Sequence, residues 1–296
     1  LKIKIISKKR IMKYTKIWIK SMVLACLFSC ACSKDKVAVN DTTEPTVDCP
    51  GKITNAVPKG NNNVLVWSDE FNTAGSPCTE NWTYDIGNSG WGNNELQYYT
   101  RDNAVVENGI LKITAKKETY RGAPYTSARM KTQDRFSFTY GKVEVRAKLP
   151  YGLGTWPAIW MLGDNISTVG WPTCGEIDIM ERAGTSSANL KITTSAIHNS
   201  SGYGNTPYVG ENEPKEDLST EFHLYSINWT ADKIEFMVDN VVHYTYQPAT
   251  KDAANWPFDK NQFVILNVAM GGTLGGNVDP DFTESAMEID YVRVYQ

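Results

Sequence analysis

Three carboxylates lie within six residues near the middle of the chain, at Glu176, Asp178 and Glu181. In a regular strand, successive side chains point to opposite faces, so Glu176 and Asp178 would share one face while Glu181 pointed to the other. A lone carboxylate buried among apolar side chains is costly. The spacing therefore predicts a β-bulge at Ile179-Met180 that turns Glu181 onto the face of the other two acids.

Two carboxyl groups that face one cleft are the minimal equipment for hydrolysis of a glycosidic bond. A retaining enzyme needs an ionised nucleophile and a protonated acid about 5–5.5 Å apart. Glu176 and Glu181 would fill these roles, with Asp178 between them as a hydrogen-bond partner of Glu176. Like charges this close raise at least one pKa, which keeps an acid protonated near neutrality. From spacing alone, a calcium-ligand cluster and a solvated acidic edge strand remain as alternatives.

Composition favours an uncharged ligand for this chain. The 296 residues are 41% hydrophobic and 21% charged, as in an ordinary soluble globular protein. Residues 1–36 hold ten of the 30 basic residues and one of the 33 acidic residues, which leaves the remainder with a net charge of −12. That balance argues against nucleic acid or an anionic polymer as the main partner. Nine tryptophans and fifteen tyrosines provide faces that stack well on sugars.

The chain divides into three predicted regions. Residues 1–32 carry a basic segment and a short apolar run, which is typical of an export signal. The run ends in a segment that resembles the bacterial lipoprotein box, with Cys30 or Cys32 as the lipidated residue. Residues 33–63 are polar and aperiodic, as expected of a flexible linker, and residues 64–296 form one domain. We expect an outer-membrane or cell-surface lipoprotein, or alternatively a secreted or periplasmic protein, that is monomeric.

Short strands separated by turns dominate the third region. Asn108-Gly109 is a hairpin signal, and Asp239-Asn240 predicts a second turn. No segment predicts a helix longer than two or three turns, so the pattern favours an all-β sandwich or barrel without repeats. The predicted strands are 64–67, 110–114, 142–148, 233–238, 241–244, 263–266 and 287–295.

Cysteines and other motifs offer fewer chemical options. In an exported protein Cys49 and Cys78 are the easiest pair to join, whereas Cys174 is expected to be a buried small hydrophobe. No HExxH motif, CxxC motif or glycine-rich phosphate loop occurs. Trp156 and Trp160 precede the acids and Trp171 lies in the intervening loop, where core packing and sugar stacking are both plausible.

The complete set of motifs resembles glycoside hydrolase family 16, specifically its laminarinase-like branch. The bulged ExDxxE signature carries this resemblance together with six other segments. The segments are Trp67–Phe71, Trp91–Gln97, Gly141–Ala147, Gly154–Trp160, Glu176–Glu181, Asn267–Gly272 and Ile289–Val294. The resemblance implies an all-β jelly-roll sandwich of two curved antiparallel sheets, with an open substrate cleft on the concave face. It also implies a retaining endo-hydrolase of β-1,3-glucan or mixed-linkage β-1,3/1,4-glucan.

The same resemblance implies roles for individual residues. Glu176 would be the nucleophile, Asp178 its assisting acid and Glu181 the general acid/base. The substrate-binding residues would be Trp156, Trp160, Trp171, Asn93, Glu95, Arg146 and His198, although a lone histidine is more often structural. The chemistry requires no cofactor, but family members bind a structural calcium, which Glu70, Asp290 and the Gly109 carbonyl would hold here.

Two observations leave the substrate open. After Gly271-Gly272 many laminarinases carry a tryptophan where this chain has Thr273-Leu274, which affects the linkage preference. Agarose, porphyran and carrageenan are alternative substrates within the family, although the acidic domain disfavours sulfated polymers.

The non-enzymatic alternative is a surface jelly-roll protein that binds glycans without hydrolysing them. The intact acid trio argues against that alternative, because binding alone needs no cluster of like charges.

Overall fold

The computed structural model describes Cys49, Gly51 and residues 61–204 and 208–296. The chain splits into two compact units, 1–45 and 46–296, and every described residue belongs to the second. The predicted signal region and lipoprotein box lie outside the described residues, as does most of the predicted linker. Among the described residues, no helix is both long and apolar enough to cross a membrane.

Ten strands of the described chain form one sheet. They span Leu65–Asp69 (β1), Gln97–Tyr99 (β3), Ala104–Glu107 (β4), Ile110–Lys116 (β5), Tyr125–Ser127 (β6), Gly141–Lys148 (β8), His223–Trp229 (β13), Ile234–Val238 (β14), Val241–Tyr246 (β15) and Glu284–Tyr295 (β17). The spatial order is β15-β14-β13-β8-β17-β5-β6-β3, with β1 also paired to β17 and β4 to β5. All pairs are antiparallel except β3 with β6, so the expected all-antiparallel sheet has one parallel exception.

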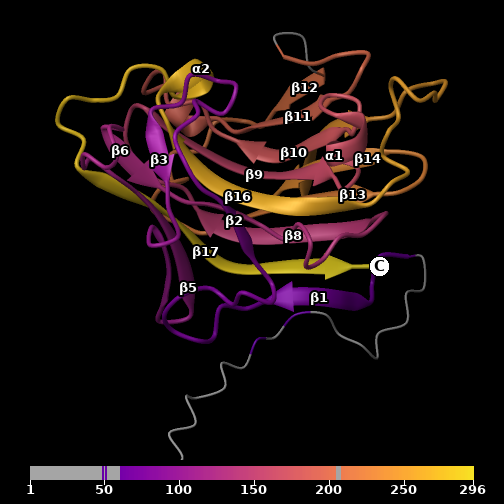
Figure 1. Cartoon of the computed structure of the whole chain (residues 1–296). Coiled ribbons are helices and arrows are strands. Elements are labelled where there is room, and N and C mark those ends of the chain that lie inside the picture. Colours follow the sequence, from indigo (N-terminus) through magenta and orange to yellow (C-terminus); the bar gives the residue numbers. More distant parts are fainter. Residues whose placement is uncertain (1–48, 50, 52–60, 205–207) are drawn as a thin grey trace, which may run out of the picture. The chain divides into compact units, whose positions relative to one another are not determined.

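Seven strands form the second sheet. They span Thr83–Asp85 (β2), Arg129–Lys131 (β7), Thr155–Gly163 (β9), Glu176–Glu181 (β10), Thr194–His198 (β11), Tyr208–Glu211 (β12) and Gln262–Met270 (β16). The order is β12-β11-β10-β9-β16-β7-β2, which places the acidic strand β10 between β9 and β11. Figure 1 shows the two sheets as facing layers, with β16, β9 and β10 on one side and β8, β17 and β1 on the other.

The core lies between the sheets and follows from the alternation of the strands. Val143 and Val145 of β8 and Ile289 of β17 pack in one cluster with Ile177 of β10 and Leu266 of β16. All nine residues of β16 are buried, which fits its fully apolar predicted segment and its central position. The two-layer β-sandwich predicted from the sequence is confirmed.

Tight turns and short helices connect the strands. Asn108 and Gly109 both have positive φ, 54° and 77°, as a two-residue hairpin requires. In the described chain the helical segments are one turn each, at Ile166–Val169 (α1), Asn189–Lys191 (a 3₁₀ turn) and Gly272–Gly275 (α2), in line with the expected lack of long helices.

The two cysteine predictions are both confirmed. Cys49 and Cys78 form a disulfide that links the start of the described chain to the domain. Cys174 is a free, buried thiol.

Candidate active site

A bulge in β10 brings the three acids together. The ladder between β10 and β9 is regular up to Asp178, then skips Ile179 and resumes at Met180. The ladder with β11 is interrupted over the same stretch, between Asp178 and Glu181. One extra residue therefore lies in β10 relative to both neighbours, as the spacing of the acids predicts.

The bulge separates apolar and acidic side chains onto two faces. Ile177, Ile179 and Met180 are all buried in the core between the sheets. The three carboxylates lie close enough on the other face to influence one another electrostatically. Asp178, at the centre, is only 3% exposed, whereas Glu176 and Glu181 are partly exposed.

Burial and mutual repulsion raise the pKa of each acid. Burial, followed by the charge of Asp178, raises the pKa of Glu176 to about 8. Burial and the charge of Glu181 raise the pKa of Asp178 well above its usual value, and burial also raises the pKa of Glu181. Because the three groups interact, they share protons as one titrating unit. Near neutrality the trio therefore retains at least one proton, as acid catalysis requires.

Two tryptophans each donate a hydrogen bond to one of the outer acids. Trp171 Nε1 donates to Glu176 Oε2 at 2.8 Å, and Trp156 Nε1 donates to Glu181 Oε1 at 2.9 Å. Each indole N–H favours the ionised form of its acid and fixes the direction of the carboxylate. The structure thus brings these two predicted tryptophans directly to the acids.

His198 also lies against the acids. It is opposite Glu176 in the ladder between β10 and β11. Its Nε2 lies 3.2 Å from Asp178 Oδ2 and 3.7 Å from Glu176 Oε1. The ring centroid of Trp171 is 5.9 Å from that of His198, so imidazole, indole and carboxylates share one small region.

A second polar group adjoins the trio around Glu95. Its Oε2 accepts hydrogen bonds from Gln97 Nε2 at 2.6 Å and from Tyr99 OH at 3.0 Å. Its Oε1 accepts one from Asn93 Nδ2 at 3.3 Å. The charge of Glu95 contributes to the raised pKa of Glu181, which places this group within electrostatic reach of the acids.

Trp160 is linked to the Glu95 group through Asn267, whose Nδ2 donates to Tyr99 OH at 3.2 Å. Its Nε1 donates to Asn267 Oδ1 at 2.8 Å, and the guanidinium of Arg129 lies 4.6 Å from its ring centroid and 5.2 Å from that of Trp91. Asp85 holds Arg129 through a 3.0 Å ion pair. Sequence reasoning missed Arg129, which has no motif of its own, and Asn267, although an amide inside the apolar run from Phe263 to Met270 is a usable signal.

Comparison with known proteins identifies the family. The sequence model described as "Glycosyl hydrolases family 16" matches residues 92–293. The chain belongs to glycosyl hydrolase family 16. It is 44% identical over 247 residues to a β-glucanase of Rhodothermus marinus, covering 78% of this chain and 85% of that protein.

Solved structures of this family share the fold of the domain. A laminarinase from Flavobacterium sp. UMI-01 matches with a TM-score of 0.73 and 46% identity, over 78% of this chain and 100% of that one. A non-specific endo-β-1,3(4)-glucanase of family 16 matches with a TM-score of 0.74 and 40% identity, over 84% of this chain and 96% of that one.

One substrate-binding residue predicted from the family resemblance lies elsewhere. Arg146 is on β8 in the ten-stranded sheet, where its Nη1 contacts Asp290 Oδ2 at 2.6 Å. The acids are on β10 in the other sheet, so the structure does not bring Arg146 to them. The regular alternation of β8 explains its direction, since Val143 and Val145 take the core-facing positions.

The predicted calcium ligands do not fit a cation site made from their side chains. Asp290 is paired with Arg146, and both carboxylate oxygens of Glu70 accept hydrogen bonds from Arg293, at 2.9 and 2.8 Å. Gly109 lies in the turn between β4 and β5. Because a guanidinium already neutralises each carboxylate, we derive no role for calcium here.

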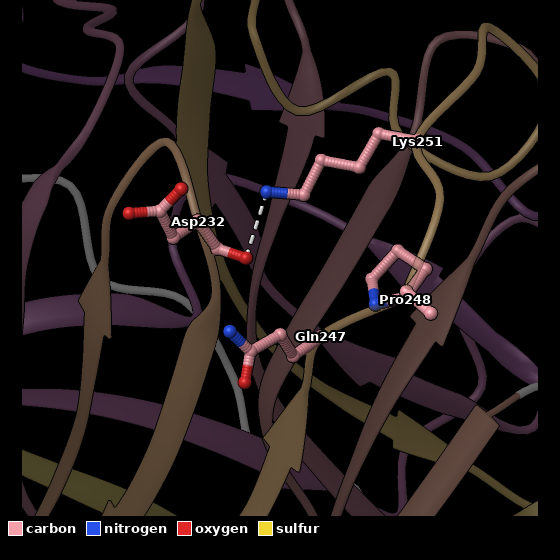
Figure 2. Close-up of a pocket in the computed structure, with 5 residues that line it drawn as sticks. Asp232, Gln247, Pro248 and Lys251 are labelled. Atoms are coloured by element: carbon pink, nitrogen blue, oxygen red, sulfur yellow. Dashed lines mark hydrogen bonds between the residues drawn. The ribbon is translucent and has the colours of Figure 1, made fainter.

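A separate hollow of about 400 Å³ is lined by residues that the chemistry does not use (Figure 2). Its lining residues are Asp232, Gln247, Pro248, Ala249 and Lys251. The Lys251 ammonium donates to the Asp232 carbonyl at 2.7 Å and lies 4.0 Å from the ring centroid of Trp256. The only ammonium in this lining is therefore already held by protein groups, and the hollow offers no acid pair for hydrolysis.

Proposed function

We propose that this protein is a retaining endo-β-1,3-glucanase of the laminarinase type that also cleaves mixed-linkage β-1,3/1,4-glucan. The single observation that supports this most strongly is the bulge in β10. It puts Glu176, Asp178 and Glu181 on one face and gives each outer acid its own indole donor. Relatives of 40–46% identity that are described as laminarinases and β-glucanases support the substrate class.

The arrangement supports a double displacement. In the first step Glu181 gives its proton to the glycosidic oxygen, and the bond from that oxygen to the anomeric carbon breaks. An oxygen of Glu176 attacks the same carbon and forms a covalent glycosyl ester. In the second step Glu181 takes a proton from water, the water oxygen attacks the carbon, and Glu176 leaves as a carboxylate.

Each neighbour of the acids has a part in this reaction. Since Trp171 occupies Oε2 of Glu176, Oε1 is the oxygen that faces the sugar. Asp178 shares a hydrogen bond with Glu176 and is the most deeply buried acid, so it takes up the proton of Glu176 when Glu176 ionises to attack the sugar. Trp156 aims the carboxyl of Glu181. The glucan would run along this face, on the concave side of the sandwich.

Substitution of the outer acids tests the proposal. Glu176→Ala and Glu181→Ala should each lower release of reducing ends from laminarin by at least about 100-fold, the lower range of what acid catalysis contributes. The matched control is Glu288→Ala, which removes a carboxylate paired with Lys148 on the other sheet and should retain activity. Full activity in either acid variant would overturn the assignment of roles.

Parallel digestion addresses the alternatives. The wild-type protein is incubated with laminarin, barley mixed-linkage glucan, cellulose, agarose and porphyran, and the first-formed anomer is read by NMR. We expect hydrolysis of the first two with retention of the β configuration. Binding of laminarin without hydrolysis would favour the non-catalytic alternative, and inversion would contradict the double displacement.

The N-terminal sequence supports a cellular location that matches this activity. We place the protein at the bacterial surface through a lipid on Cys30 or Cys32, with the segment up to residue 63 as a tether. Metabolic labelling with a fatty acid, compared between Cys30→Ala and Cys32→Ala variants, would identify the modified residue.

A further inference from the structure

Two of the three acids and the neighbouring histidine present three ligand atoms to one point. Within the described part of the chain, Glu176, Asp178 and His198 offer oxygen and nitrogen atoms that all lie within 4.8 Å of one another. We propose that these three side chains bind a divalent transition-metal ion such as Zn²⁺, and that the ion competes with the glucan. The competition, but not the binding, rests on the proposed function.

The distances fit a zinc ion. Zinc takes nitrogen and oxygen ligands at about 2.0–2.2 Å in tetrahedral geometry, so adjacent ligand atoms lie roughly 3.3–3.5 Å apart. His198 Nε2 is 3.2 Å from Asp178 Oδ2 and 3.7 Å from Glu176 Oε1, values that bracket this spacing. Small shifts of two side chains would complete one triangular face of a tetrahedron, with the fourth position left for water.

The directions of the ligand atoms also fit. Asp178 is 3% exposed, yet its Oδ2 has no hydrogen-bond partner among the described residues despite the nearby imidazole. A buried carboxylate oxygen without a partner is rare and calls for an explanation. On Glu176, Trp171 occupies Oε2 and leaves Oε1 turned toward the imidazole. The buried Oδ2 of Asp178, which has no hydrogen-bond partner, therefore lies beside the imidazole Nε2 and on the same side as Glu176 Oε1.

The ligand types predict which metal binds. An imidazole with two carboxylates suits zinc or copper, whereas calcium and magnesium prefer sites made only of oxygen. Occupation would fix the Oε1 lone pair of Glu176, the same lone pair that the proposed reaction uses as nucleophile. Metal and sugar would then exclude one another at this point.

Calorimetric titration of the full chain with ZnCl₂, in a buffer that does not bind zinc, tests the binding. We expect the wild type to bind one equivalent of zinc at this site. His198→Gln and Glu176→Gln should each weaken the zinc affinity by at least about tenfold, which is the smallest loss typical of removing a residue that only hydrogen-bonds to a metal ligand. His243→Gln is the matched control, because His243 contacts Ser195 at 3.0 Å and lies outside the trio. Any zinc bound by the N-terminal cysteines is common to all four proteins and cancels.

The outcomes separate the two proposals. Loss of one zinc site in both His198→Gln and Glu176→Gln, but not in His243→Gln, supports the site. Weaker zinc binding in the presence of a laminari-oligosaccharide also supports it. Unchanged zinc binding in His198→Gln and Glu176→Gln overturns the proposed zinc site, as does an affinity of the wild type for Ca²⁺ equal to its affinity for Zn²⁺. In laminarin assays Zn²⁺ should raise KM and leave kcat unchanged, and EDTA should reverse this. A protein that binds zinc at the trio but never hydrolyses laminarin would refute the function and leave the site standing.

Discussion

The acids of β10 and three acids on the ten-stranded sheet lie in opposite surroundings. On the ten-stranded sheet Glu288 is paired with Lys148 and Asp290 with Arg146, while Glu70, just beyond β1, is paired with Arg293. The side chains of these three acids are 28–33% exposed. On the seven-stranded sheet, Glu176, Asp178 and Glu181 have no lysine or arginine partner within the described chain, and their neighbours are indoles, an imidazole and one another.

The difference shows what makes an acid chemically useful. Arg293 lowers the pKa of Glu70, so this group is ionised at any physiological pH and has no proton to give. Burial and like charges raise the pKa values of the trio, so its members exchange protons near neutrality. Such a cluster opposes folding, and a chain retains it where the chemistry needs it.

The sharpest test of this comparison replaces one aspartate by asparagine on each sheet, in two separate variants. Asp178→Asn should lower kcat/KM on laminarin by about 10–100-fold, because it removes a charge-assisted hydrogen bond to Glu176. Asp290→Asn, the matched change on the other sheet, should alter kcat/KM by less than about twofold, since exposed ion pairs contribute little. A loss in Asp290→Asn as large as that in Asp178→Asn would erase the distinction.

Removal of the indole hydrogen bonds should have a smaller effect on activity and should distinguish the role of Glu176 from that of Glu181. Trp171→Phe and Trp156→Phe each remove one indole N–H and retain a ring, and each should cost about tenfold in kcat/KM. Without Trp171 the pKa of Glu176 rises, which moves the acidic limb of the pH–rate profile to higher pH. Without Trp156 the pKa of Glu181 rises, which moves the alkaline limb to higher pH. Movement of the same limb in both variants would contradict the assigned roles.

The sequence predicts the elements of this site better than its contacts. The bulge can be predicted because Glu181 is three residues after Asp178, so regular alternation would turn Glu181 to the opposite, apolar face. One extra residue in the strand returns Glu181 to the face of Asp178. Resemblance alone placed Arg146 near the acids. Matching of motifs does not say which sheet a strand joins, and β8 joins the other one. The contacts of Arg129 with Trp91 and Trp160 join residues that are distant in the chain, so no local sequence pattern predicts them.

Stability measured against pH distinguishes the two kinds of carboxylate with opposite signs. The raised pKa of Glu176 means that the folded protein binds more protons than the unfolded chain between about pH 4.5 and 8, so stability falls as pH rises through that window. Glu176→Gln should therefore raise Tm by several degrees at pH 8.5 and by almost nothing at pH 4. The lowered pKa of Glu70 contributes stability that is present above pH 4.5 and is lost as pH falls below it.

Glu70→Gln should consequently lower Tm near neutrality, by about 2–4 °C or less, since a partly exposed ion pair with Arg293 contributes at most about 1 kcal/mol. This deficit should shrink under acid conditions. Scanning calorimetry of wild type and both variants at pH 4, 7 and 8.5 measures all three trends. Destabilisation by Glu176→Gln at pH 8.5 would mean that the trio stabilises the folded protein. The predicted difference in stability between the acids of β10 and the arginine-paired acids would then be wrong.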